Sequence, residues 1–192
     1  MFETLVNFDR NFFMALNSMH TPFMDTVMWW IADKFIWLPL YILLAVFLFL
    51  KYGKPSVFMI LFAALLIIIS DQTSVMIKYM FERERPCHDE ILSLMVHTVN
   101  NKCGGKFGFV SSHAANTMAV FTYLLLIARN RYKKITLITA VWVALVGYSR
   151  IYLGVHYPAD IVGGWFVGIC AAFATYIIYR LFFDSPSTDP QL

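Results

Sequence analysis

The chain has 192 residues, of which 59% are hydrophobic and 14% charged, with a formal net charge of +3. Soluble domains average roughly 45–50% apolar and about 25% charged residues. Such an excess of apolar side chains does not fit in one small water-soluble core, and the mean hydropathy of +0.64 agrees. The composition therefore excludes an ordinary soluble domain and predicts an integral membrane protein.

Residues 1–20 predict a helix that lies on the membrane surface. Leu5, Phe8, Phe12 and Leu16 recur at helical spacing, which is typical of an amphipathic interfacial helix. The first eighteen residues carry acids and no basic segment at their start, so we expect no cleavable signal peptide. The segment 22–35 is short and charged for a membrane span. Whether it forms a sixth, short or re-entrant membrane segment is left open.

The rest of the chain contains apolar runs that approach the ~20 residues needed to cross a bilayer. Because backbone polar groups facing lipid must be satisfied internally, these runs predict helices. The expected spans are 36–51, 57–80, 113–129, 134–150 and 158–182. The predicted fold is an all-α membrane bundle of five or six helices, with a membrane domain over 21–183. The polar residues 184–192 predict a disordered tail.

Alternating these spans puts the loops 81–112 and 151–157 on one side of the membrane. The opposite side carries the cluster RNRYKK at 129–134, which contains no acid. Lys and Arg are almost evenly divided between the two sides, so the prediction rests on this cluster, which the positive-inside rule places in the cytoplasm. The expected location is the inner membrane of a bacterium, with the 81–112 loop outside. In an oxidising space Cys87 and Cys103 could pair.

Three polar segments fall on the predicted outer face: KYMFERERP at 78–86, VSSHAAN at 110–116 and SRIYLGVHYPAD at 149–160. In the second segment Ser111 or Ser112 can cap the helix that His113 begins. In the third, Pro158 suits a first helical turn and Asp160 follows within it. A single Lys or Arg at a helix end is more often an interface anchor. Three such segments in this order favour a functional site.

The residue types in these segments indicate phosphoryl transfer. Cations and free amides at a helix start bind phosphate oxygens. An imidazole held by a carboxylate is a positioned nucleophile or base, and a second imidazole can give a proton to a leaving oxygen. No metal is needed in this arrangement.

The segments resemble the three motifs of the type 2 phosphatidic acid phosphatases, which run K-x6-R-P, P-S-G-H and S-R-x5-H-x3-D. These membrane lipid phosphatases share a catalytic core with vanadium haloperoxidases. The resemblance covers residues 57–182 and implies that His156 is the nucleophile, Asp160 orients it and His113 protonates the leaving oxygen. It also implies that the phosphate oxygens are held by Lys78, Arg85, Ser111, the amide of Ser112, and Arg150. It implies a lipid substrate and no cofactor or metal.

The second motif departs from the pattern, because Val110 replaces Pro and Ser112 replaces Gly. The overall layout is similar to short members from the Bacteroides group, some resembling lipid A 4'-phosphatases and others undecaprenyl-diphosphate phosphatases. Phosphatidylglycerol phosphate and phosphatidic acid are alternative substrates. No nucleic acid or obligate protein partner is expected.

Two other readings of the polar residues belong to different classes. A transporter or proton relay would use Asp71, Lys78 and Asp160 inside the bundle. A vanadate-dependent peroxidase is the remaining alternative. We expect a structural role for Asp71, through pairing with a polar neighbour, and helix-packing roles for Gly163, Gly164 and Gly168.

Overall fold

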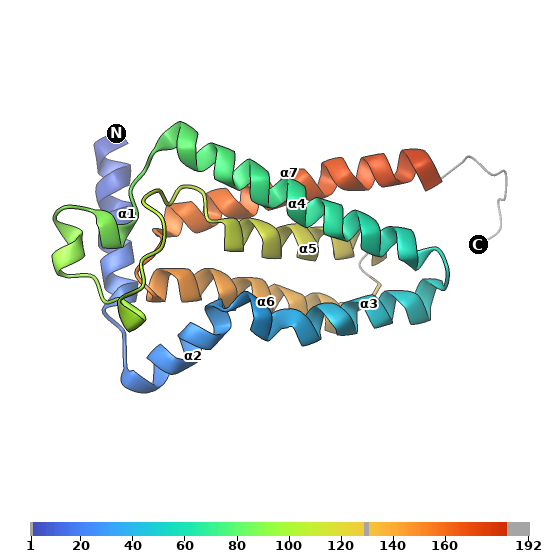
Figure 1. Ribbon diagram of the computed structural model, residues 1–192, viewed down its shortest axis with the longest axis horizontal. Coiled ribbons are helices and arrows are strands. Elements are labelled where there is room, and N and C mark those ends of the chain that lie inside the picture. The colour runs from blue at the N-terminus through green and yellow to red at the C-terminus, as the bar shows by residue number, and fades with distance from the viewer. Residues whose placement is uncertain (1, 129–130, 184–192) are drawn as a thin grey trace.

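The computed structural model describes residues 2–128 and 131–183, which form an all-helical bundle (Figure 1). The predicted tail at 184–192 lies outside the described residues. Within them there is no β-strand, only one isolated bridge. The predicted fold class is therefore confirmed.

Five long helices lie side by side and make up the bundle (Figure 1). They are α3 (Leu38–Tyr52), α4 (Ser56–Phe81), α5 (Ser112–Ala128), α6 (Lys133–Tyr152) and α7 (Pro158–Phe183). The predicted spans match them with boundaries within two residues. A 3-10 turn, η1 (Lys34–Trp37), leads into α3. Gly53 ends α3 with a φ of 62°, a conformation that favours glycine.

The bundle presents apolar side chains outward. Leu50, Leu61 and Ile68 are 77%, 58% and 59% exposed, and contiguous exposed apolar surface of this kind is rare on soluble proteins. In the part of the chain that the structure describes, four helical segments, η1 with α3, α4, α6 and α7, are long and apolar enough to cross a membrane. Helix α5 is shorter, and its 17 residues extend about 25 Å. The surface is that of a protein surrounded by lipid.

Helix α5 lies in the middle of the bundle, where it contacts α4, α6 and α7. Its backbone approaches α7 closely because α7 carries glycines at the contact. A Cβ at Gly164 would lie 2.6 Å from the carbonyl oxygen of Ser111, and one at Gly168 would overlap that of Ala115. The predicted packing role of these glycines is confirmed. This contact also brings the first turns of α5 and α7 together.

Helix α1 (Phe2–Asn17) crosses one end of the bundle at a steep angle (Figure 1). Its stripe of Leu5, Phe8 and Phe12 is exposed, whereas Asp9 and Phe13 on the opposite face are buried. The ring of Phe13 packs edge-on against Tyr157 at 5.3 Å. An apolar stripe turned away from the core suits an interfacial helix. Its place at a membrane surface stays a prediction.

Residues 22–35 form no sixth span. Helix α2 (Pro22–Ala32) has 11 residues, which extend only about 16 Å against a hydrocarbon core of about 30 Å. Thr21 caps it by accepting a hydrogen bond from the amide of Met24 at 3.2 Å, and the helix packs on α6. The short length of α2 therefore rules out a sixth membrane span in this segment.

The two ends of the bundle differ (Figure 1). One end carries α1, the long connection from α4 to α5 and the short turn between α6 and α7. That connection contains three single 3-10 turns, η2 (Pro86–His88), η3 (Leu92–Leu94) and η4 (Val99–Asn101). The other end carries the α3–α4 turn and the last turn of α7. All three predicted polar segments therefore meet at the α1 end.

Candidate active site

The segment after α4 pairs with the segment before α5 and aims two arginines inward. The amide of Arg85 donates to the carbonyl of Lys106 at 3.0 Å, and the amide of Gly108 donates to the carbonyl of Arg83 at 2.8 Å. Alternate side chains of extended backbone share a face, so Arg83 and Arg85 point the same way. Glu84 points outward to Lys106, 2.9 Å away. The alternation in ERERP thus places the two arginine side chains on the same, inward face of the segment.

A disulfide between Cys87 and Cys103 closes this connection, with the two Cα atoms 5.9 Å apart. The pairing considered from the sequence is therefore present in the structure. It ties the residues that follow Arg85 to those that precede Gly108. Cys170 is a free, exposed cysteine on α7.

His156 and Asp160 form a buried pair at the start of α7. Nδ1 of His156 lies 3.3 Å from Oδ2 of Asp160, and the two side chains are 2% and 0% exposed. The same carboxylate oxygen accepts the amide of Tyr157 at 2.9 Å. A carboxylate facing Nδ1 favours the tautomer with a proton on Nδ1. That tautomer leaves Nε2 with a free lone pair.

Gly108 allows the loop to pass directly over this pair. A Cβ at that position would lie 3.0 Å from Oδ2 of Asp160 and 3.2 Å from Cγ of Arg85. Any larger residue would have to displace one of them. Gly108 is thus a close-contact position beside the dyad.

Three cations act on the ring of His156. Nη1 of Arg85 lies 3.4 Å from Nε2, and the charges of Arg150 and Lys78 also act on the ring. The Nε of Arg150 is buried and has no hydrogen-bond partner among the described residues. A buried guanidinium with an unmade hydrogen bond is costly unless a ligand completes it. The cluster is therefore built for an anion.

Burial and the cations set the protonation of His156. Burial lowers the pKa of His156 well below its usual value, and the charges of Arg85, Arg150 and Lys78 lower it further. The ring is neutral near pH 7. His113, in the first turn of α5, lies within electrostatic reach of His156 and of the same cations. Two imidazoles and three cations thus form one electrostatic cluster.

Ser111 and Ser112 have different environments. Ser111 caps α5, since its Oγ accepts the amide of Ala114 at 3.5 Å. It is fully buried, and its own amide donates to the carbonyl of Asp160 at 2.9 Å. The hydroxyl of Ser112 accepts a short hydrogen bond from Lys78. The serine that departs from the family pattern therefore contacts a predicted phosphate ligand.

Two further polar residues inside the bundle serve structure. Oδ1 of Asp71 accepts a hydrogen bond from Nδ2 of Asn116 at 3.1 Å, which joins α4 to α5. The pairing expected for Asp71 is confirmed. Ser74, one turn further along α4, lies 2.6 Å from the hydroxyl oxygen of Ser112.

Sequence reasoning missed Arg83 and Asp9. Arg83 donates to Oδ1 of Asp160 at 2.9 Å and to Oδ2 of Asp9 at 2.6 Å. The alternation in ERERP gave a signal for Arg83, because it shares a face with Arg85. Asp9 gave a weaker one, as an acid opposite the apolar stripe of α1. Within residues 2–128 and 131–183, no group of three His, Cys, Asp or Glu side chains is placed to hold a metal.

A cavity of about 340 Å³ opens beside the site, with Lys78 and Arg85 in its wall. Its other lining residues are Val75, Tyr79, Gly105, Lys106 and Phe107. A phosphate reaching the cations through this cavity would come from the side of α4. The cavity is therefore the candidate route to the dyad.

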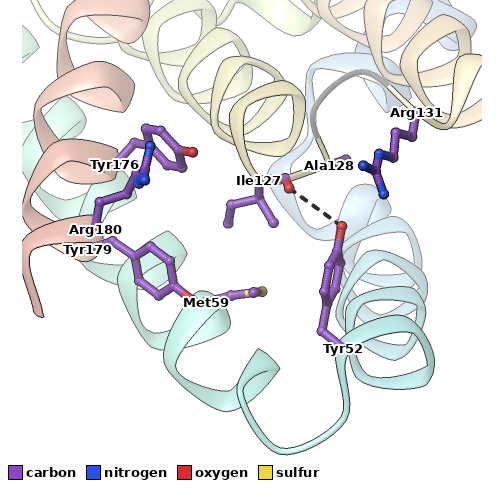
Figure 2. Close-up of a pocket in the computed structure, with 8 residues that line it drawn as sticks. All are labelled: Tyr52, Met59, Ile127, Ala128, Arg131, Tyr176, Tyr179 and Arg180. Carbon is purple, nitrogen blue, oxygen red and sulfur yellow. Dashed lines mark hydrogen bonds between the residues drawn. The ribbon is translucent and has the colours of Figure 1, made fainter. Parts of the chain in front are cut away.

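A second cavity, of about 250 Å³, lies at the other end of the bundle (Figure 2). Tyr52 donates a hydrogen bond to the carbonyl of Ile127 at 3.5 Å across it. Met59 lines it, and this residue is nineteen positions before Lys78 on α4, or about 28 Å along the helix. None of the predicted site residues lines this cavity.

Comparison with known proteins identifies the class. Lipid A 4'-phosphatase from Porphyromonas gingivalis is 36% identical over 179 residues, covering 92% of this chain and 75% of the relative. Lipid A 4'-phosphatase from Bacteroides thetaiotaomicron is 32% identical over 182 residues, covering 93% and 80%. The crystal structure of a transmembrane PAP2-type phosphatidylglycerolphosphate phosphatase from Bacillus subtilis has the same fold. Its TM-score is 0.67 at 24% identity, covering 93% of this chain and 87% of that one.

The fold, the site and these relatives define a multi-pass bacterial membrane phosphatase. The PAP2 superfamily matches residues 56–184, and the chain belongs to that family. The enzyme reading of the sequence is thereby confirmed against the transporter reading.

Proposed function

We propose that the chain removes a phosphate from a membrane lipid through a phosphohistidine on His156, without a metal. The observation that carries this is the buried, unpartnered Nε of Arg150 beside a histidine whose Nε2 faces Arg85. The phosphate of lipid A is the favoured substrate, because two relatives that are over 30% identical across most of this chain carry that name. Undecaprenyl diphosphate is the next candidate, followed by phosphatidylglycerol phosphate and phosphatidic acid.

In the first step the neutral Nε2 of His156 attacks phosphorus and forms an N–P bond. The Nδ1 proton stays on the ring, facing Asp160, which stabilises the positive charge that develops. The bond from phosphorus to the lipid oxygen breaks, and protonated His113 gives that oxygen its proton. The product is a lipid alcohol, or a lipid monophosphate when the substrate is a diphosphate.

In the second step water replaces the nitrogen. Neutral His113 takes a proton from the water, whose oxygen attacks phosphorus while the N–P bond breaks. Inorganic phosphate leaves and His156 is neutral again. Lys78, Arg85 and Arg150 offset the charge on the transferring group in both steps, as a metal does in other phosphatases. Ser111 and the amide of Ser112 complete the oxygen contacts.

The site would face the periplasm. The disulfide between Cys87 and Cys103 supports this, because disulfides persist in oxidising spaces. It lies in the connection from α4 to α5, at the end of the bundle where α7 begins (Figure 1). The substrate would then be an outer-leaflet lipid whose phosphate lies near the membrane surface.

The test is phosphate release by the purified protein from the four lipids above, with and without EDTA and vanadate. We expect the highest rate on lipid A, no change with EDTA and inhibition by vanadate, which mimics five-coordinate phosphorus. His156→Ala should abolish turnover and leave the protein folded. Loss of activity in EDTA that magnesium restores would refute the metal-free mechanism, and full activity of His156→Ala would refute the nucleophile.

A further inference from the structure

Arg83 joins two carboxylates that come from opposite ends of the sequence. Its Nη1 donates to Oδ1 of Asp160 at 2.9 Å and its Nη2 donates to Oδ2 of Asp9 at 2.6 Å. Asp160 is 0% and Asp9 is 9% exposed. The planar fork of a guanidinium fits two carboxylates at once. Without this cation, two buried negative charges would stand close together without compensation.

The contact with Arg83 completes the partners of Asp160. Oδ2 accepts the amide of Tyr157 at 2.9 Å and faces Nδ1 of His156, while Oδ1 accepts from Arg83. With both oxygens held, the plane of the carboxylate is fixed relative to the imidazole. The guanidinium carbon of Arg83 also lies 4.1 Å from the centre of the Tyr157 ring, which restrains it further.

Asp9 holds Arg83 in turn. Its second oxygen, Oδ1, accepts the amide of Ala159 at 2.9 Å, in the first turn of α7. Asp9 thus binds both the arginine that contacts Asp160 and the backbone next to Asp160. The helix α1, the segment after α4 and the start of α7 are linked at this one carboxylate.

We propose that Arg83 and Asp9 are positioning residues for the dyad. Arg83 fixes the carboxylate of Asp160, and Asp9 fixes Arg83, so α1 contributes one positioning residue, Asp9, to the site. This inference rests on the proposed function of His156 as the nucleophile. It assigns a role to two residues outside the three motifs.

The same helix offers a matched control. Arg10, next to Asp9, makes an ion pair with Asp89 at 2.6 Å. That pair also ties α1 to the connection after α4, but it does not touch Asp160. Arg10→Gln therefore removes one anchor of α1 and leaves the link to the dyad intact. It separates an effect on α1 from an effect on Asp160.

The experiment compares kcat and KM of Arg83→Met, Arg83→Lys, Asp9→Asn, Arg10→Gln and His156→Ala on the lipid that the wild type hydrolyses fastest. We expect kcat of Arg83→Met to fall about 10- to 100-fold, as for other partners that orient a site ligand. KM should stay near the wild-type value, since Lys78, Arg85 and Arg150 are intact. Asp9→Asn should lose less, and Arg83→Lys should recover part of kcat. Arg10→Gln should match the wild type in both parameters.

Equal losses in Arg83→Met and Arg10→Gln would overturn the inference, because Arg83 would then only anchor α1. A raised KM with unchanged kcat in Arg83→Met would overturn it too, since that marks a phosphate ligand. If Arg83→Met does not fold, Arg83→Lys and Asp9→Asn decide: lower kcat in both supports the inference and wild-type kcat in both refutes it. An active His156→Ala would refute the proposed function, whereas an inactive one beside a fully active Arg83→Met refutes only this inference.

Discussion

Nη1 of Arg85 lies 3.4 Å from Nε2 of His156, the nitrogen left free when Nδ1 faces Asp160. A phosphate bound to Arg85 is therefore held next to the atom that would attack it. The same closeness disfavours a proton on the ring, because two positive charges would repel. In the proposed mechanism, activation of His156 and phosphate binding thus depend on the same cation.

This relationship predicts how activity depends on pH. Burial and the charges of Arg85, Arg150 and Lys78 lower the pKa of His156 well below its usual value. The proposed nucleophile, His156, should stay neutral as the pH falls through ~6.5, the pKa of an ordinary histidine. The value of kcat/KM should therefore begin to fall only below that pH. A phosphomonoester itself titrates near pH ~6, so profiles for a mono- and a diphosphate lipid are to be compared. A fall in kcat/KM that begins at or above pH ~6.5 with both the mono- and the diphosphate lipid would contradict the prediction.

The stability of the folded protein should also decrease as the pH falls. The folded pKa of His156 is depressed, so below about 6.5 the unfolded chain binds a proton that the folded protein does not. The contribution of this neutral ring to stability is present above that pH and is lost as the pH falls toward the folded pKa.

Replacing His113 with Ala should slow the departure of the lipid oxygen. General acid catalysis typically contributes about 10²- to 10⁴-fold, and a poor leaving group depends on it most. We expect a larger loss of kcat on a phosphomonoester than on a diphosphate, whose leaving phosphate needs less help. The control is His88→Ala, at an exposed histidine in the connection from α4 to α5. It should not change either rate. Equal losses on both substrates would argue against His113 as the acid.

Gly168→Ala should destabilise the bundle. The new Cβ would overlap the carbonyl oxygen of Ala115 on α5, and extra atoms in a packed interior typically cost about 1–3 kcal/mol. The matched control is Gly105→Ala, where a Cβ meets nothing within 4 Å. Thermal unfolding in detergent should show a lower midpoint for the first variant alone. Equal midpoints would mean that α5 and α7 can separate without cost.

The disulfide allows a test of which side of the membrane the site faces. A membrane-impermeant thiol reagent added to intact spheroplasts should label Cys87 or Cys103 only after mild reduction, because the two are bonded to each other. Cys170 lies on α7, twelve residues after Pro158, and should remain unlabelled inside the membrane. Labelling of the pair only after the membrane is broken would place the site in the cytoplasm instead.

The sequence by itself determined the positions of the long helices. Apolar runs such as 57–80 admit only one structure in lipid, because every backbone N–H and C=O must be paired inside the segment. The three polar segments and their resemblance to the family motifs likewise predicted His156, Asp160 and Lys78 as site residues, since the chemistry of phosphoryl transfer restricts which residue types can occur together. The helix positions need only local composition and spacing.

The tertiary structure decided which side chains meet. Asp9 and Arg83 are 74 positions apart, and no spacing rule connects an acid on a surface helix to a loop arginine. The hydroxyl of Ser112, which the sequence shows only as a departure from the motif, hydrogen-bonds Lys78. Such contacts arise when α5 and α7 pack closely enough to bring their first turns together. They depend on the relative placement of several elements, which the pattern within any one element does not contain.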